Sequence, residues 1–323
     1  MEIGNIISEV KTKLNAVGGL KNIFFIACGG SQAAIYPAHY LMQTEAKSIP
    51  SSIYNSNEFV HATPASLNEN SICILCSLNA TAETVEAVKL ANSKGAVTIA
   101  MTGSPDTLMA QNGQYKVVYS NGDDQIYSQA NQALALKLGF EILNQFENYE
   151  NYSVAMAAYD KLDDIVEYGK TVLLPDAKKF AEDFKDDEVF YVMGSGPLYG
   201  TVYTMACCHF MEMQGKHAVT LHSGEYFHGP FETTDKDLAI VLLKSSGRTR
   251  PLDERGEIFL KEYGEHYTII DVEELISNKI DDKVAEFFNS IIMIPIERFF
   301  VYQMSLIRNH SMDDRRYMWK VAY

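Results

Sequence analysis

Short runs of valine, isoleucine and phenylalanine that end in glycine or serine constrain the fold more than any other feature. They alternate with helical stretches, and the pattern occurs twice, because IFFIACGGS (23–31) resembles VFYVMGSGP (189–197). The next strand-like runs are SICILCS (71–77) and AVTIAMTGS (96–104) in the first half, and DLAIVLLKSS (237–246) and HYTIIDV (266–272) in the second. Strand, helix and strand with short turns favour parallel strands joined by right-handed crossovers. The sequence therefore predicts an α/β fold with two tandem doubly wound parallel sheets, each in a flavodoxin-like three-layer αβα domain.

The repeat also suggests where the domains begin and end. Between the halves, charged residues alternate with apolar ones at helical spacing, which predicts a helical connector over 151–187. We expect an N-terminal helix and the first domain over 1–150, the second domain over 188–310, and a C-terminal tail over 311–323. The apolar run 289–310 is predicted to form a last strand as far as Pro295 and then a helix.

Charge and cysteine content limit the classes of partner and compartment. Lysine and arginine total 27 against 42 aspartates and glutamates, so the net charge is −15 and a nucleic acid would be repelled. No apolar run reaches the roughly 18 residues of a membrane span, and the N-terminus lacks the apolar core of a secretory signal. Five cysteines fit a reducing compartment. We expect a cytoplasmic protein that binds neither nucleic acid nor membrane.

Two motifs resemble cofactor or metal sites but are better explained otherwise. Cys73 and Cys76 form a C-x-x-C pair, but they lie in a predicted buried strand, where side chains three apart point to opposite faces. No further cysteine or histidine cluster has the spacing of zinc ligands. The segment ACGGSQAA lacks the third glycine of the dinucleotide fingerprint. The sequence predicts neither a metal nor a nicotinamide cofactor.

Two strand ends in the first half offer groups that could bind a phosphate. Gly30 and Ser31 follow one strand and open a helical stretch, and Ser77, Asn79 and Thr81 follow another. In open α/β sheets ligands bind at such carboxyl ends, where hydroxyls and free N–H groups hold anions. The same residue types are also ordinary helix caps and turn residues. Both interpretations remain open from these residues alone.

In the second half, residues 198–214 are predicted to form a helix that Gly215 ends. Met205, Cys208 and Glu212 share one stripe of it, so Glu212 lies on the face that would otherwise be buried. Partial burial suits a carboxylate to proton transfer near neutral pH.

The alternative for Glu212, favoured by helix physics alone, is a glutamate that pairs with Lys216 or reaches solvent. Downstream, His222, Glu225 and His228 crowd into a predicted loop that ends in His-Gly-Pro. So many titratable groups in a short stretch favour a functional role.

The tail carries the basic and aromatic segment RRYMWK (315–320), which contains the single tryptophan of the chain. A frayed, solvated end is the ordinary interpretation. The aromatic content indicates instead a tail that docks, and a docked tail could bring Lys320 to a cleft for carbonyl or Schiff-base chemistry.

Together, the duplicated halves, the serine and threonine loop, the helix glutamate and HSGEYFHGP resemble the double sugar-isomerase (SIS) domain family over nearly the whole chain. The chain is similar to the isomerase part of glucosamine-6-phosphate synthases. The segments ACGGSQAAIYPAHY and RRYMWKVAY are more similar to bacterial fructoselysine-6-phosphate deglycases.

This resemblance implies roles for individual residues. Glu212 corresponds to the glutamate that moves a proton between C1 and C2. His228, sixteen residues later, corresponds to the histidine associated with ring opening and often contributed by a neighbouring subunit. Lys320 corresponds to the C-terminal lysine of the family. His222 and Glu225 are expected near these groups or at the amine of the substrate.

The resemblance also places the phosphate on Ser31, Ser77 and Thr81. The usual loop reads Ser-x-Ser-Gly-x-Thr, whereas SLNAT is one residue shorter and has Asn79 and Ala80 where the middle serine and the glycine are expected. We therefore expect Asn79 to replace only part of the serine contact.

The implied function is hydrolysis of a fructosamine 6-phosphate to glucose 6-phosphate and a free amine such as lysine, without a cofactor. Isomerisation or deamination of glucosamine 6-phosphate is an alternative, and so is a regulator that binds a sugar phosphate without turnover. A homodimer or larger assembly is implied, because the family's site borrows groups across an interface. The segment before the first predicted strand is too short for the glutaminase domain of the synthases, so no release of ammonia from glutamine is expected.

Overall fold

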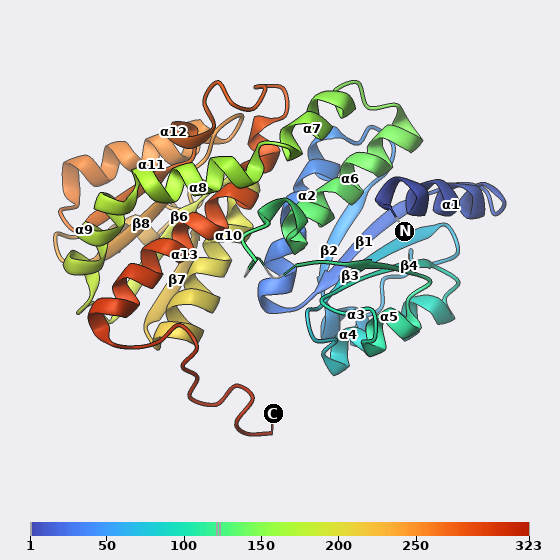
Figure 1. Ribbon diagram of the computed structural model, residues 1–323, viewed down its shortest axis with the longest axis horizontal. Coiled ribbons are helices and arrows are strands. Elements are labelled where there is room, and N and C mark those ends of the chain that lie inside the picture. The colour runs from blue at the N-terminus through green and yellow to red at the C-terminus, as the bar shows by residue number, and fades with distance from the viewer. Residues whose placement is uncertain (1, 121, 123, 323) are drawn as a thin grey trace. The chain divides into compact units, whose positions relative to one another are not determined.

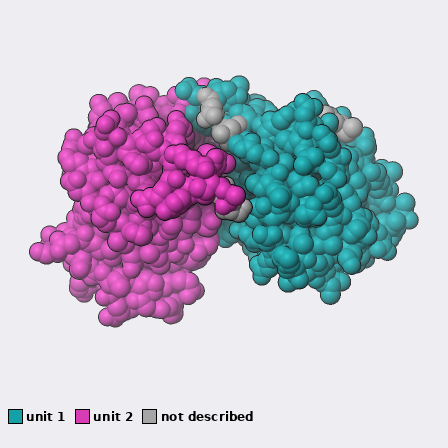
Figure 2. Space-filling model, turned by 90° about the horizontal axis from the view of Figure 1, so that it is seen from below, with its two compact units in different colours: residues 1–163 teal, residues 164–323 magenta. Residues whose placement is uncertain are grey.

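The computed structural model describes residues 2–120, 122 and 124–322. The chain divides into two compact units, residues 1–163 and 164–323, which Figure 2 colours separately. Each unit contains a parallel sheet with flanking helices (Figure 1). The predicted α/β fold with two tandem parallel sheets is confirmed.

Unit 1 contains a five-stranded sheet in the order β2-β1-β3-β4-β5, as far as the described residues show. Its strands are β1 (Asn22–Ala27), β2 (Ser51–Asn55), β3 (Ser71–Cys76), β4 (Val97–Thr102) and β5 (Tyr115–Val118). Its helices are α1 (Ile3–Asn15), α2 (Gly29–Glu45), α3 (Ser56–His61), α4 (Ala82–Ser93), α5 (Leu108–Asn112), α6 (Asn131–Glu147) and α7 (Tyr152–Tyr159).

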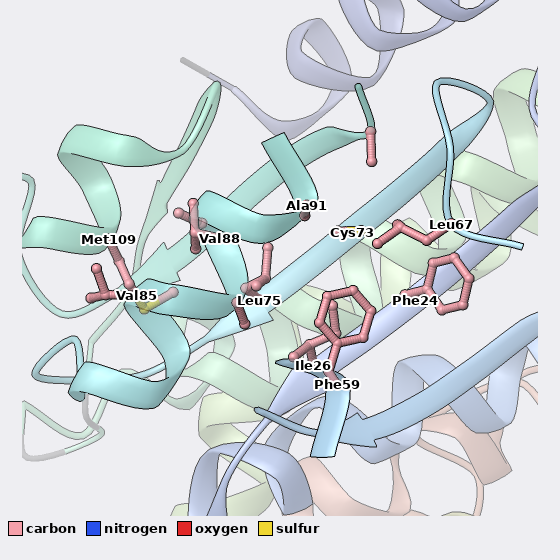
Figure 3. Packing of buried hydrophobic residues seen from close by; sticks show 13 residues of the cluster. Phe24, Ile26, Phe59, Leu67, Cys73, Leu75, Val85, Val88, Ala91 and Met109 are labelled. Carbon is pink, nitrogen blue, oxygen red and sulfur yellow. The ribbon is translucent and has the colours of Figure 1, made fainter. Parts of the chain in front are cut away.

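The core of unit 1 lies on both faces of this sheet. On one face, Phe24, Phe59, Leu75 and Val88 belong to a buried cluster between the sheet and α4 (Figure 3). On the other face, Phe25 packs against His39 of α2, with 5.8 Å between the ring centroids. Alternate residues of one strand thus enter different layers, as the period of a strand requires.

The C-x-x-C pair lies in a fully buried strand, β3, as predicted. Cys73 belongs to the cluster on the α4 side, whereas the Cys76 thiol lies 3.8 Å from the Tyr119 hydroxyl. Both cysteines are free thiols, and burial raises the pKa of Cys76 to about 12.

Unit 2 contains a four-stranded sheet in the order β7-β6-β8-β9 in the part of the chain that is described. Its strands are β6 (Val189–Gly194), β7 (His217–His222), β8 (Ala239–Lys244) and β9 (Tyr267–Asp271). Its helices are α9 (Leu174–Phe184), α10 (Tyr199–Tyr203), α11 (Arg250–Tyr263), α12 (Glu273–Ile276) and α13 (Asn289–Arg308), and α8 (Leu162–Val172) begins at the boundary between the units.

Three strands were absent from the sequence prediction, namely β2, β5 and β7. Each is an edge strand of its sheet. Edge strands bury less of their length, and the partial burial of β2 and the alternating burial of β5 leave room for polar residues. The apolar run that marks a central strand is therefore missing from them.

The prediction of a strand ending at Pro295 is wrong, because residues 289–308 form the single helix α13. A short run that is apolar on every side cannot distinguish a buried strand from a buried helix. The segment Ala285–Arg308 is long and apolar enough to span a membrane by length and composition, but 61% of its most apolar window is buried inside the protein. It is the core helix of unit 2, packed against α9.

Candidate active site

The carboxyl ends of β1, β2 and β3 lie at one level of the unit 1 sheet. Ala27 pairs with Asn55 of β2 on one side and with Cys76 of β3 on the other. Because the strands are parallel, the segments after them begin at the same edge. The structure therefore brings Gly30 and Ser31 to the edge where Ser77, Asn79 and Thr81 lie.

Two helices start at this edge without a side-chain cap. The capping residues are Cys28 for α2 and Thr81 for α4, and neither side chain accepts a hydrogen bond from the first turn. Gly29 has φ +56°, and a side chain there would meet nothing within 4 Å. Uncapped N–H groups carry the positive end of the helix dipole. Two such ends at one edge favour a negatively charged group there.

The shortened SLNAT loop has a defined closure. The amide of Thr81 donates to the hydroxyl of the buried Ser77 at 3.1 Å, and the hydroxyls of Thr81 and Thr84 lie 3.2 Å apart. Ala80 has φ +53°, the left-handed conformation that the glycine of the usual loop would adopt freely. An alanine there costs about 1 kcal/mol. Asn79 and Thr81 are exposed.

The equivalent edge of unit 2 is filled by carboxylates of the chain itself. Asp253 is fully buried and accepts from the Ser223 hydroxyl at 2.6 Å, the Ser245 hydroxyl at 2.5 Å and the Ser245 amide at 2.8 Å. Glu286 accepts from the amide of Arg248 at 3.0 Å and from its Nε at 2.5 Å. Donors that would otherwise be available to an anion are therefore occupied.

Glu212 lies on a helix of unexpected type. The predicted helix 198–214 is present, but after α10 its residues Thr204–Met213 form a ten-residue π-helix. Such i to i+5 hydrogen bonding is rare and is frequently found at functional sites. Met205 is buried, and burial together with the Glu212 carboxylate raises the pKa of Cys208 to about 12.

The partner of Glu212 is Arg315, whose Nε donates to Oε1 at 2.8 Å. The Glu212 side chain is 23% exposed and that of Arg315 is 7% exposed. Lys216, the partner considered from the sequence, instead pairs with Glu188 at 2.7 Å. Glu212 thus combines a fixed ion pair with access to solvent.

The histidine segment is only partly a loop. His222 is the last residue of β7, and its Nδ1 accepts from the Gly224 amide at 3.0 Å, so the neutral ring carries its proton on Nε2. Its ring lies edge-on to Tyr199 at 5.3 Å. The side chains of Glu225 and His228 are exposed in the following turn. Among the described residues, no hydrogen bond or ion pair joins His222, His228 and Glu212.

The tail docks through its first residues and leaves the remainder exposed. Met312 is buried, whereas Trp319 is 71% exposed. Lys320 is exposed as well, and its Nζ donates to the backbone oxygen of Arg315. Figure 1 shows this segment leaving the end of α13.

Residues 20–139 match the family model of the SIS domain. Over 318 residues the chain is 38% identical to the fructosamine deglycase FrlB of Bacillus subtilis (strain 168), with 98% of this chain and 97% of the relative covered. The chain belongs to the SIS-domain family.

Two further relatives match most of the chain. The fructoselysine 6-phosphate deglycase of Escherichia coli O157:H7 is 23% identical over 299 residues, which cover 92% of this chain and 85% of the relative. A solved structure from Salmonella typhimurium LT2, assigned as a candidate phosphosugar isomerase, has a TM-score of 0.94 at 37% identity and covers 99% of this chain and 98% of that one. The prediction that this chain is an enzyme of the SIS-domain family is confirmed.

Sequence reasoning missed two groups in this SIS-domain chain. Arg315 was seen only as part of a basic tail, although it contacts Glu212. Asp253 was overlooked because it is an acidic residue in the first turn of a helix, where such residues are common. Its burial beside Ser223 and Ser245 could have been suspected from the SSGRT loop that precedes α11.

Proposed function

We propose that this enzyme hydrolyses a fructosamine 6-phosphate, such as fructoselysine 6-phosphate, to glucose 6-phosphate and the free amine. The observation that carries the proposal is Glu212, a partly exposed carboxylate held by Arg315 on a π-helix. The similarity to a fructosamine deglycase over 98% of the chain supports the same reaction class.

The proposed reaction needs one base and one acid but no redox step. His228 assists opening of the sugar ring by exchanging a proton with the ring oxygen. Glu212 takes a proton from C1 while the carbonyl oxygen at C2 takes one from water, which gives an enaminol. Glu212 then returns its proton at C2 as the nitrogen gives its own proton to water. The product is an imine at C1, which water hydrolyses to the aldehyde of glucose 6-phosphate with release of the amine.

The phosphate is assigned to unit 1. Gly30 and Ser31 at the start of α2, together with Ser77, Asn79 and Thr81, supply amide and hydroxyl donors for it. The uncapped ends of α2 and α4 support this assignment. Phosphate binding supplies remote binding energy that positions C1 and C2 for proton transfer.

The remaining residues are assigned to the sugar chain and the amine. We propose that Lys320 contacts the open-chain carbonyl, with the tail over the site, and that His222 and Glu225 contact the leaving amine. The exposure of Glu225 and Lys320 supports roles that begin only when substrate is bound. All five cysteines are free thiols, in keeping with a cytoplasmic enzyme.

The experiment is an incubation of the purified enzyme with fructoselysine 6-phosphate and, separately, with glucosamine 6-phosphate. Release of glucose 6-phosphate and lysine from the first is the expected result. Fructose 6-phosphate formed only from the second would favour the isomerase or deaminase alternative. Thermal stabilisation by both compounds without turnover of either would favour a regulator.

We also propose a homodimer in which His228 acts in the site of the neighbouring subunit. The His228 imidazole is exposed, and within the described part of the chain it has no hydrogen-bond or ion-pair partner. Both observations support a role in the neighbouring subunit. Mixing inactive Glu212→Gln and His228→Asn subunits should then restore about a quarter of wild-type activity, because hybrid dimers regain one intact site. A mixture that stays inactive, although light scattering detects hybrid dimers, would contradict this arrangement.

A further inference from the structure

The C-terminal segment is built around the guanidinium of Arg315. Its Nη1 donates to the backbone oxygen of Met312 at 2.9 Å and to that of Asp314 at 2.8 Å. The Trp319 ring lies 5.4 Å from the guanidinium, and Lys320 donates to the backbone oxygen of Arg315. The tail therefore binds Nη1 of the guanidinium and leaves Nε for Glu212, before any substrate binds.

The same segment is fastened to the end of the π-helix. Gln214 is 1% exposed, and its Nε2 donates to the backbone oxygen of His310 at 3.1 Å. Arg308 donates to the Gln214 backbone oxygen at 3.0 Å and to its Oε1 at 2.8 Å. Because Gln214 follows Glu212 by two residues, the position of Arg315 is tied to the helix that carries the carboxylate.

The contact between the two side chains uses only half of the carboxylate. Arg315 Nε donates to Glu212 Oε1 at 2.8 Å, and within the described residues Oε2 accepts no hydrogen bond. A charge-assisted hydrogen bond to a guanidinium fixed in this way restricts the plane of the carboxylate. Without it, a glutamate in the last turn of a helix has several rotamers available.

We propose that Arg315 is a positioning residue for the proton transfer, which holds Glu212 through Oε1 so that Oε2 takes the proton from C1 and returns it at C2. This inference rests on the proposed function. In this arrangement the tail orients Glu212 before substrate binds, in addition to the role proposed for Lys320. Arg315 itself does not touch the substrate.

The test compares Arg315→Gln, Arg315→Lys and Arg315→Ala with the wild type, by kcat and KM for fructoselysine 6-phosphate. Misplacement of a catalytic group by about 1 Å costs about 100-fold in rate, so kcat should fall about 10- to 100-fold in the glutamine variant, with KM within about twofold. The kcat of the lysine variant should lie between those of the wild type and the glutamine variant. The lysine amine can reach Oε1 but cannot also bind two backbone oxygens. Lys283→Gln, a charge removal at an exposed site of the same unit, is the matched control and should leave both constants unchanged.

Chemical rescue separates positioning from general damage to the fold. Millimolar guanidinium should raise kcat of Arg315→Ala, whereas urea at the same concentration should not. A glutamine variant with unchanged kcat would overturn the inference. So would a higher kcat, which would make Arg315 a brake, or a raised KM with normal kcat, which would place it on the substrate. If the wild type releases no glucose 6-phosphate, the proposed function itself fails and the inference falls with it.

Discussion

The two units share a plan but differ at the carboxyl edges of their sheets. In unit 1, the edge carries two uncapped helix starts and the exposed side chains of Asn79 and Thr81. In unit 2, the corresponding serine and threonine loop is occupied by the carboxylates of Asp253 and Glu286. A carboxylate and a phosphate use the same donors. One duplicated element thus offers donors to an anion in the first unit and satisfies them internally in the second.

The repeated loop alone therefore does not define a binding site. The capacity of the loop to bind an anion depends on whether an acidic side chain of the same unit already contacts its hydrogen-bond donors. Unit 2 has instead the π-helix with Glu212, for which unit 1 offers no counterpart among its described elements. Under the proposed function, the phosphate contacts belong to unit 1 and the proton transfer to unit 2.

The largest expected effect concerns proton transfer in unit 2. Glu212→Gln keeps the size of the side chain but removes the base, so kcat should fall about 10³-fold with little change in KM. Glu265→Gln, at an exposed site of the same unit, is the control for loss of one carboxylate. Steady-state assays of glucose 6-phosphate release measure both. Turnover that survives in the glutamine variant would remove Glu212 from the reaction.

A second prediction concerns acid, to which buried groups of the two units respond in opposite directions. Burial lowers the pKa of His39 in unit 1 to about 4. Between pH 6.5 and 4, His39 is therefore protonated in the unfolded chain but neutral in the folded unit. Stability should fall by about 1.4 kcal/mol per pH unit, and by about 3 kcal/mol in all, as the pH drops from 6.5 to 4. Burial raises the pKa of Glu297 in unit 2, which acts in the opposite sense.

The measurement for His39 is urea unfolding of the wild type and His39→Asn at several pH values between 7 and 4. The asparagine can still contact Ser51, the partner of His39 Nδ1 at 3.0 Å, but does not titrate. The wild type should lose stability relative to the variant as the pH falls. Parallel curves for the two proteins would show that His39 takes up its proton without cost.

The filled edge of unit 2 should depend on its internal carboxylate for stability. Asp253→Asn places an amide where three hydrogen-bond donors converge, and should cost about 2 kcal/mol of unfolding free energy. KM should change less than twofold, because no substrate contact is assigned to Asp253 or to its partners Ser223 and Ser245. Urea unfolding and steady-state kinetics decide the matter. A stable variant with a raised KM would reverse the assignment of the two units.

The smallest effect comes from a matched pair of threonines at the two edges. Thr81→Val in unit 1 removes a proposed phosphate contact and should lower kcat/KM about tenfold. Thr249→Val in unit 2 removes a hydroxyl that lies 3.2 Å from the Ser245 hydroxyl and should change kcat/KM less than twofold. Equal losses in the two variants would remove the distinction between the edges.

Much of the fold could be predicted because central strands are recognisable from their local sequence. The runs that became β1, β3 and β8 are buried along nearly their whole length, so their composition alone identifies them. Edge strands such as β7 expose part of their length and mix polar with apolar residues. The strand predicted before Pro295 was wrong, because a run that is apolar on every side has neither the period of a strand nor that of a helix.

The candidate site was predictable only where it depends on spacing along the chain. The presence of a helix around Glu212 follows from the sequence, but its π-helical hydrogen bonding does not, since the same residues suit an α-helix. The contact between Arg315 and Glu212 joins residues 103 apart in the sequence, and no local pattern encodes it. The same holds for Asp253, whose partner Ser223 lies 30 residues away.

The most direct test of the account follows the hydrogens at C1. Fructoselysine 6-phosphate that carries two deuterons at C1 should give glucose 6-phosphate with one deuteron left at C1, because Glu212 must remove the other to form the enaminol. The rate should show a primary isotope effect in the wild type, and Glu212→Gln should form almost no product. A product that keeps both deuterons at C1, as fructose 6-phosphate from direct displacement of the amine would, contradicts proton transfer by Glu212.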